Sequence, residues 1–180
     1  MTRPDAKRLL GSGFPGDTGE ADARLTEALA AYRSGEGTYV AALAALVGTR
    51  VLVPVVAVLG EVEHDEQGLA HDKSSDMAAV LMTTPSGRRG LLAFTGTEAL
   101  HRWNPEARPV PVTVEHAALA ALQEEADALV VDVGGPVQLV VEGQDLEAVA
   151  RGWRLVFVEG RAAWVAPADG ADEGSTAADA

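Results

Sequence analysis

Cysteine is absent from this sequence of 180 residues. Its absence excludes disulfides, thiolate zinc sites, iron–sulfur clusters and cysteine nucleophiles. Basic residues are also scarce, because 14 Lys and Arg stand against 27 Asp and Glu, which gives a formal net charge of −13. A surface of that sign repels phosphate backbones and anionic lipid headgroups, so we expect neither a nucleic-acid partner nor a membrane partner.

Long hydrophobic runs are missing as well. The longest strongly apolar stretch, Val51–Leu59, has nine residues, whereas a membrane-spanning helix needs about 20. No apolar stretch follows the basic start of the chain, so we expect no signal peptide and a cytoplasmic location. Hydrophobic residues make up 47% and charged residues 23% of the chain, which is typical of a globular domain.

The order of apolar patterns and turn residues predicts an α/β (α+β) fold, with a mixed, largely antiparallel sheet packed with helices. Turn-rich connections between several strands favour antiparallel pairing. Strands are expected at 51–59, 75–82, 91–94, 110–114, 128–133 and 137–141, and a final hairpin around Glu159-Gly160.

Capping residues and breakers mark the expected helices. Asp17, with Glu20 three residues later, predicts the first N-cap, and Thr38 predicts the second. Thr95-Gly-Thr-Glu98 matches a capping box, which predicts the start of a third helix. Pro105 is expected to end this helix near residue 104. Two further helices are expected at 115–126, with Leu119, Leu122 and Ala126 on one side, and at 145–151.

The chain divides into four segments by composition. Residues 1–19 are predicted to be a flexible leader and residues 20–152 the folded domain. Residues 153–167 are expected to add a C-terminal β-hairpin, and residues 168–180 a disordered acidic tail with four acids and no base.

The sequence offers no coherent catalytic constellation. His64 and His71 lie in the segment richest in possible metal ligands, but their spacing matches no helical or tight-loop ligand pattern, so we interpret the segment as a solvated loop. Ser75 and Asp76 lead into a predicted strand and are interpreted as turn residues. An alternative function for Asp76 is to form a polar and aromatic patch at a sheet end with Phe94 and Thr95.

Three separate blocks in the chain resemble a known family. They are Val51–Glu61, the block Lys73-Ser-Ser-Asp-Met-Ala78, and Leu92–Leu100 followed by Trp103. In this order they resemble the N-terminal domain of the SseB-like family, of the actinobacterial type, over roughly residues 14–151. The resemblance implies a compact α/β domain with a mixed sheet. It brings no agreed catalytic residue, and the family's labels of serine sensitivity and secretion leave its biochemical role unsettled.

These observations lead us to expect a non-catalytic protein-interaction or regulatory domain without a cofactor. Its partner would be a protein, unidentified and favoured to be basic, or a second copy of the chain. A candidate binding surface comprises Ser75, Asp76, Phe94, Thr95 and Trp103. The alternative is a sensor that binds an amino acid or similar metabolite near Asp76 and Thr95. A more remote alternative is a metal-dependent hydrolase that uses His64 and His71.

Overall fold

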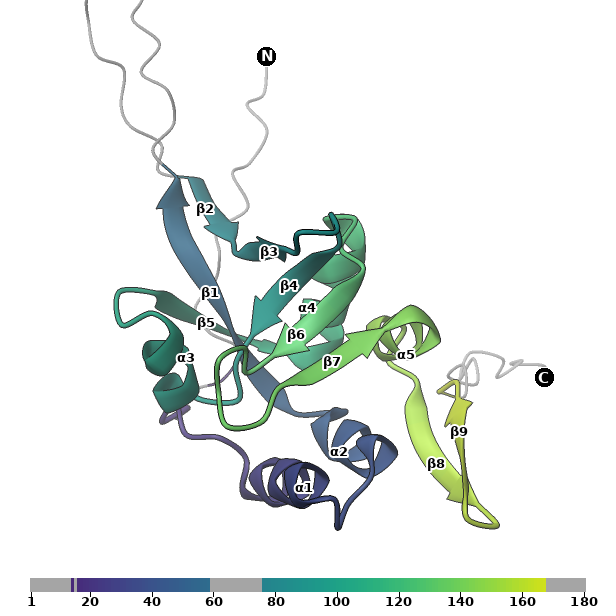
Figure 1. Ribbon diagram of the computed structural model, residues 1–180. Coiled ribbons are helices and arrows are strands. Elements are labelled where there is room, and N and C mark those ends of the chain that lie inside the picture. The colour runs from purple at the N-terminus through teal and green to yellow at the C-terminus, as the bar shows by residue number, and fades with distance from the viewer. Residues whose placement is uncertain (1–13, 15, 59–75, 168–180) are drawn as a thin grey trace, which may run out of the picture.

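A computed structural model describes residue 14 and residues 16–58 and 76–167 of the chain (Figure 1). Within these residues the helices are α1 (Ala23–Ser34), α2 (Tyr39–Leu46), α3 (Thr97–Trp103), α4 (Val114–Gln123) and α5 (Gly143–Ala150). The strands are β1 (Arg50–Val58), β2 (Asp76–Ala79), β3 (Leu81–Thr83), β4 (Arg89–Ala93), β5 (Arg108–Thr113), β6 (Ala128–Val131), β7 (Leu139–Glu142), β8 (Arg154–Val158) and β9 (Arg161–Val165). None of the helices in this part of the chain has the length and hydropathy needed to cross a bilayer.

The strands form two connected sheets, together with a separate hairpin. The first sheet has the order β2-β1-β5 and the second has the order β3-β4-β6-β7. Leu52 of β1 and Phe94, which follows β4, exchange two backbone hydrogen bonds of 2.8 Å and join the sheets. Strands β4 and β6 run parallel, while the other pairs are antiparallel. The predicted α+β fold with a mixed, largely antiparallel sheet is confirmed.

Alternate residues of the strands enter two different cores. Leu91 and Ala93 of β4 pack in the larger core with α1, α2, α4 and α5. Leu92 and Phe94 pack in a smaller core with Leu100 of α3. Because successive side chains of a strand point to opposite faces, both faces of β4 are covered. Its burial on both sides fixes the position of the turn that follows it.

The helix starts agree only partly with the sequence patterns. Thr38 caps α2 as predicted, since its side chain accepts a hydrogen bond from the N–H of Ala41. The predicted N-cap at Asp17 is wrong: Asp22 caps α1, accepting from the N–H of Leu25 at 3.0 Å. Asp17 instead forms an ion pair with Arg50 at 2.7 Å. Asp17 and Asp22 both place an acidic side chain before the apolar stripe of α1, and the ion pair with Arg50 leaves Asp22 as the cap.

The strand predicted over residues 75–82 is divided between the two sheets. Asp76–Ala79 pair with β1 and Leu81–Thr83 pair with β4. Val80 lies at the transition, where its N–H donates to the carbonyl of Pro54 and its carbonyl accepts from Leu92. A single apolar pattern therefore covers a segment that changes partner, which strand periodicity alone does not reveal.

Pro54 lies within β1, opposite Pro109 of β5. Nearby, Leu52 uses both its N–H and its carbonyl toward Phe94, so its pairing with Pro111 needs no hydrogen bond from the proline. Strand β5 lies at the edge of its sheet, where the missing N–H of a proline is tolerated. Pro54 itself lies in β1, the central strand of this sheet.

The C-terminal hairpin is present, and it is anchored at one point to the rest of the chain. Strands β8 and β9 surround Glu159 and Gly160, whose φ angles of 49° and 76° suit a two-residue hairpin turn. The indole N–H of Trp164 donates to Asp145 of α5 at 2.8 Å, and the hydroxyl of Tyr39 donates to the same carboxylate at 3.0 Å. Figure 1 shows the hairpin projecting beyond α5.

Candidate functional site

The candidate site lies where the parallel strands β4 and β6 end. Carboxyl ends of neighbouring parallel strands form a common edge, where ligands often bind in sheets of this kind. Thr95 follows β4 and Asp132 follows β6, and the N–H of Asp132 donates to Ala93 at 2.9 Å. Thr95 and Asp132 are the two buried polar side chains among the described residues, each 6% exposed.

Two hydrogen bonds join these buried residues. The backbone N–H of Thr95 donates to Oδ1 of Asp132 at 2.9 Å, and the Thr95 hydroxyl donates to Oδ2 at 2.8 Å. Asp132 has a left-handed backbone, with φ of 55°, a conformation that aspartate adopts more readily than most residues. Each carboxylate oxygen keeps further acceptor capacity beyond these bonds.

The segment before α1 lies against the turn after β4. Arg50 binds both, because it donates to the carbonyl of Thr95 at 2.9 Å and to the Asp17 carboxylate and the Glu20 carbonyl at 2.7 Å each. The N–H of Thr97 donates to the carbonyl of Gly19 at 2.7 Å. Asp17 and Gly19, which the sequence patterns assign to the leader, therefore contact the domain directly.

Gly96 permits this close approach. A Cβ atom at Gly96 would lie 2.9 Å from the backbone N of Ala21 and 3.0 Å from the carbonyl oxygen of Gly19. Gly96 is also the N-cap of α3, with no side-chain capping bond. The predicted capping box at Thr95 is therefore wrong, because the hydroxyl that would cap the helix is bound to Asp132.

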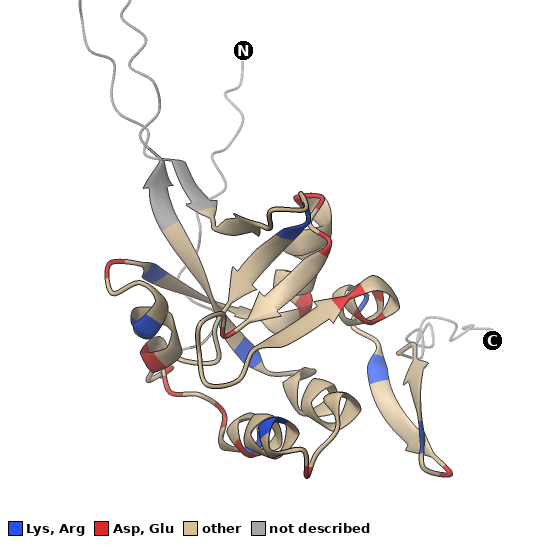
Figure 2. Cartoon of the chain, viewed as in Figure 1, with Lys and Arg blue, Asp and Glu red and all other residues tan. Residues whose placement is uncertain are grey.

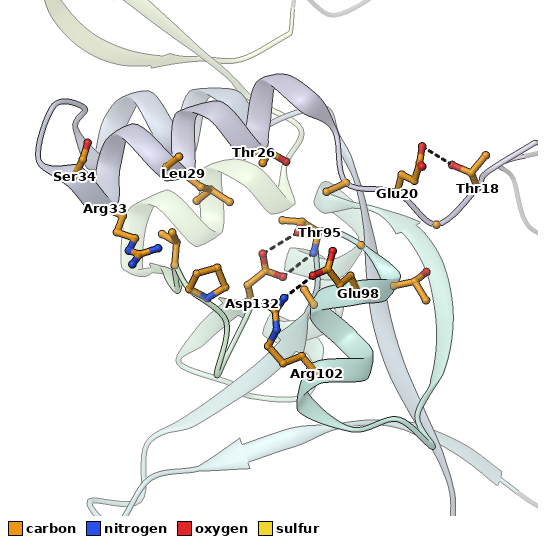
Figure 3. A pocket seen from close by; sticks show the side chains of 18 residues that line it. Thr18, Glu20, Thr26, Leu29, Arg33, Ser34, Thr95, Glu98, Arg102 and Asp132 are labelled. Atoms are coloured by element: carbon orange, nitrogen blue, oxygen red, sulfur yellow. Dashed lines mark hydrogen bonds and ion pairs between the residues drawn. The ribbon is translucent and has the colours of Figure 1, made fainter.

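A pocket of about 940 Å³ opens above these residues, between α1, α3 and the loop after β6 (Figure 3). Leu29 of α1 and Val137 of the loop line its apolar part. Arg33 of α1 and Arg102 of α3 bring positive charge to opposite sides of it. The volume is within the range of about 300–1,000 Å³ that is usual for small-molecule sites.

The carboxyl group of Asp132 is the buried acid among the residues that line this pocket. Burial raises the pKa of its carboxyl above the usual value, while the hydrogen bonds from Thr95 and the positive charge of Arg102 oppose the rise. Arg102 is itself bound to Glu98 at 2.6 Å, so its charge is shared. The site thus holds a carboxylate without a direct cationic partner among the described residues, next to an open cavity.

The predicted surface residues are not all brought together. Thr95 lines the pocket, but Phe94 is completely buried in the smaller core and packs against Trp103, with ring centroids 5.4 Å apart. Asp76 pairs with Val58, six residues along β1 from Leu52 and about 20 Å away at the usual rise of a strand. Its backbone therefore lies far from Thr95. Ser75, His64 and His71 lie outside the described residues.

Asp132 is the residue that sequence reasoning missed. The available signal was an acidic residue between an apolar strand and the pair Gly134-Gly135, a pattern that fits an ordinary turn equally well. The pairing with Thr95 spans 37 positions, and no local pattern encodes it. In the described part of the chain, no group of three or more His, Asp or Glu residues is placed to hold a metal ion.

Residues 25–148 match the family model described as the SseB protein N-terminal domain. This range includes Thr95, Asp132 and most of the pocket lining, and it ends before the β8–β9 hairpin. No curated protein and no solved structure matches the chain.

Proposed function

The chain belongs to the SseB family, and we propose that its domain binds a small molecule that carries a protonated amine, of the amino-acid type, in the pocket above Asp132. The buried carboxylate of Asp132 is the observation that carries the proposal. A buried ionised group is costly unless it is paired, and an ammonium group entering the pocket supplies the missing cation.

The rest of the pocket suits the other parts of such a ligand. Arg33 and Arg102 can receive a carboxylate or another anionic group. Leu29 and Val137 offer an apolar surface for a side chain. Asp132 is the only buried acid among the described residues, and its hydrogen bonds go to Thr95 rather than to a nucleophile or a second acid, so we propose a sensor or carrier role.

A thermal-shift assay on the full chain tests this function. The panel contains free amino acids, including serine, with ethanolamine and propionate as probes for the amine and the carboxylate alone. A ligand at a hundredfold excess over its Kd adds about 2.7 kcal/mol of stability, or about 5 to 10 °C in Tm for a chain of this size. We expect amino acids to give the largest shift, ethanolamine a smaller one and propionate none.

Two variants make the test specific. Asp132→Asn keeps the size of the side chain and a hydrogen-bonding partner for Thr95 but removes the charge, so we expect the shift to disappear. Glu106→Gln makes the same chemical change at an exposed residue outside the pocket lining and should keep the shift. A wild-type chain that no panel member stabilises, or an equal shift in Asp132→Asn, would refute the proposal.

The protein-interaction role remains our second candidate function. One observation favours it: large apolar side chains are exposed on the β8–β9 hairpin. A cytoplasmic location stays a prediction.

A further inference from the structure

All five of the large hydrophobic residues that are exposed in the described part of the chain lie in two places. Phe157, Val158 and Val165 lie on the β8–β9 hairpin and are 56%, 59% and 47% exposed. Leu119 and Leu122 lie on α4 and are 41% and 38% exposed. Exposed apolar residues that gather in this way mark interaction surfaces more often than scattered ones do.

The hairpin has an inner and an outer face. Leu155 and Trp164 are paired across the strands and pack against the larger core, which defines the inner face. Because side chains alternate along a strand, the outer face carries Val156, Val158, Ala163 and Val165, with Arg154 opposite Val165 and Arg161 opposite Val158. We call these six residues the hairpin patch. Its arginines are exposed and pair with no carboxylate among the described residues.

The charge of the hairpin is opposite to that of the chain. Residues 153–167 hold two arginines and one glutamate, a formal net charge of +1. The total is −13, so the remaining residues carry −14. Figure 2 shows basic residues on both strands of the hairpin and an acidic residue at its turn, whereas the acidic residues elsewhere lie mainly on helices and loops.

The outer surface of α4 has the complementary composition. Leu119 and Leu122 lie one turn apart on this helix, and the exposed Glu124 and Glu125 follow immediately. We call these four residues the α4 patch. One surface thus combines valines with arginines, and the other combines leucines with glutamates.

We infer that the hairpin patch of one molecule docks on the α4 patch of a second copy of this chain. Apolar contact between valines and leucines supplies the affinity, and the opposite charges fix the orientation. This inference is independent of the function proposed for the pocket.

Sedimentation velocity of the full chain over a dilution series at 150 mM salt tests the inference. The salt screens the repulsion between two chains of net charge −13, with a Debye length of about 8 Å. We expect concentration-dependent association, which closes as a dimer if the two contacts are reciprocal and grows as a chain if they are not. A wild-type chain that stays monomeric up to about 1 mM, where a Kd corresponds to only −4.1 kcal/mol, would overturn the inference.

Charge reversal identifies the surfaces. The variant R154E/R161E makes the hairpin patch acidic, and E124K/E125K makes the α4 patch basic. Each variant alone should associate at least tenfold more weakly than the wild type, since it juxtaposes like charges. An equimolar mixture of the two restores both opposite-charge contacts, so association should return in the mixture only.

Matched controls exclude an effect of net charge. R24E/R108E and E27K/E106K make the same changes in charge at exposed residues outside both patches and should associate as the wild type does. All substituted side chains are exposed, and circular dichroism checks that each variant is folded. Association that persists in both reversal variants, or a mixture of them that stays monomeric, would overturn the assignment of these surfaces.

Discussion

Where β4 and β6 end, two polar side chains are buried at 6% exposure each, whereas on the β8–β9 hairpin three large apolar side chains are 47–59% exposed. Both arrangements depart from the usual partition of residue types, and such departures are the informative ones. They also lie in different parts of the chain, because the first falls within residues 25–148 of the family match and the second lies after it.

The difference shows that the unfavourable placement is compensated in one region and left uncompensated in the other. At the pocket, hydrogen bonds from Thr95 and the positive charge of Arg102 compensate the carboxylate of Asp132. No buried polar side-chain atom in the described residues lacks a partner. The hairpin has no such compensation for its exposed residues. It is held at its base by Trp164 and Asp145, which leaves its outer face available.

Truncation of two phenylalanines, one in each region, should give the largest difference in the free energy of unfolding. Phe94 is fully buried in the smaller core, and Phe157 is 56% exposed on the hairpin. Truncating a buried phenylalanine leaves a cavity, so Phe94→Ala should lower the free energy of unfolding by about 3–5 kcal/mol. Phe157→Ala should change it by about 0.5 kcal/mol or less. Urea unfolding of both variants measures the two values, and a loss above about 2 kcal/mol in Phe157→Ala would show that the hairpin tip packs on the domain.

Substitution of two buried glycines by alanine should have an intermediate effect on the free energy of unfolding. At Gly96 a new Cβ would collide with backbone atoms of residues 19–21, which cannot move without breaking the bond from Thr97 to Gly19. We expect Gly96→Ala to cost about 1–3 kcal/mol in stability and to weaken ligand binding in the pocket. At Gly90 the collision is with the Cγ2 methyl of Val130, at 2.7 Å. A side chain yields more easily than backbone, so Gly90→Ala should cost less in a denaturant titration and leave the pocket intact. The opposite ranking would show that residues 19–21 are not fixed against the turn.

The sequence patterns succeeded where local chemistry decides the structure. The cap at Thr38, the end of α3 before Pro105 and the hairpin turn at Glu159-Gly160 all depend on neighbouring residues. They failed where a distant partner decides. Thr95 fits a capping box, yet its hydroxyl bonds Asp132, and Asp17 fits an N-cap, yet its carboxylate bonds Arg50.

Helix α4 shows a different limit. Leu119, Leu122 and Ala126 suggest one apolar side, but both leucines are exposed, while Val114 and three alanines, Ala117, Ala118 and Ala121, are buried. An apolar pattern contains two candidate faces when alanine is as frequent as leucine. Small side chains allow a helix to approach its neighbours closely, so the alanine face packs inward. The sequence therefore indicated the helix but not the face that the α4 patch presents.

The smallest expected effect is the pH dependence that Asp132 confers. Burial raises the pKa of its carboxyl, so the folded state binds this proton more tightly than the unfolded state does. Its contribution to stability is complete below the ordinary aspartate pKa of about 3.9 and is lost as the pH rises through the folded value. The other charged residues that line the pocket are the same in the wild type and in the variant, so the difference between the two proteins reports on Asp132; they are Arg33, Arg102, Glu20 and Glu98. The difference in unfolding free energy, wild type minus Asp132→Asn, should therefore fall as the pH rises above about 4. Denaturant titrations between pH 3.5 and 8, with Glu106→Gln as the control, measure this difference. A difference that increases with pH would mean that the ionised carboxylate is stabilised in the empty pocket, and Asp132 would then need no cationic ligand.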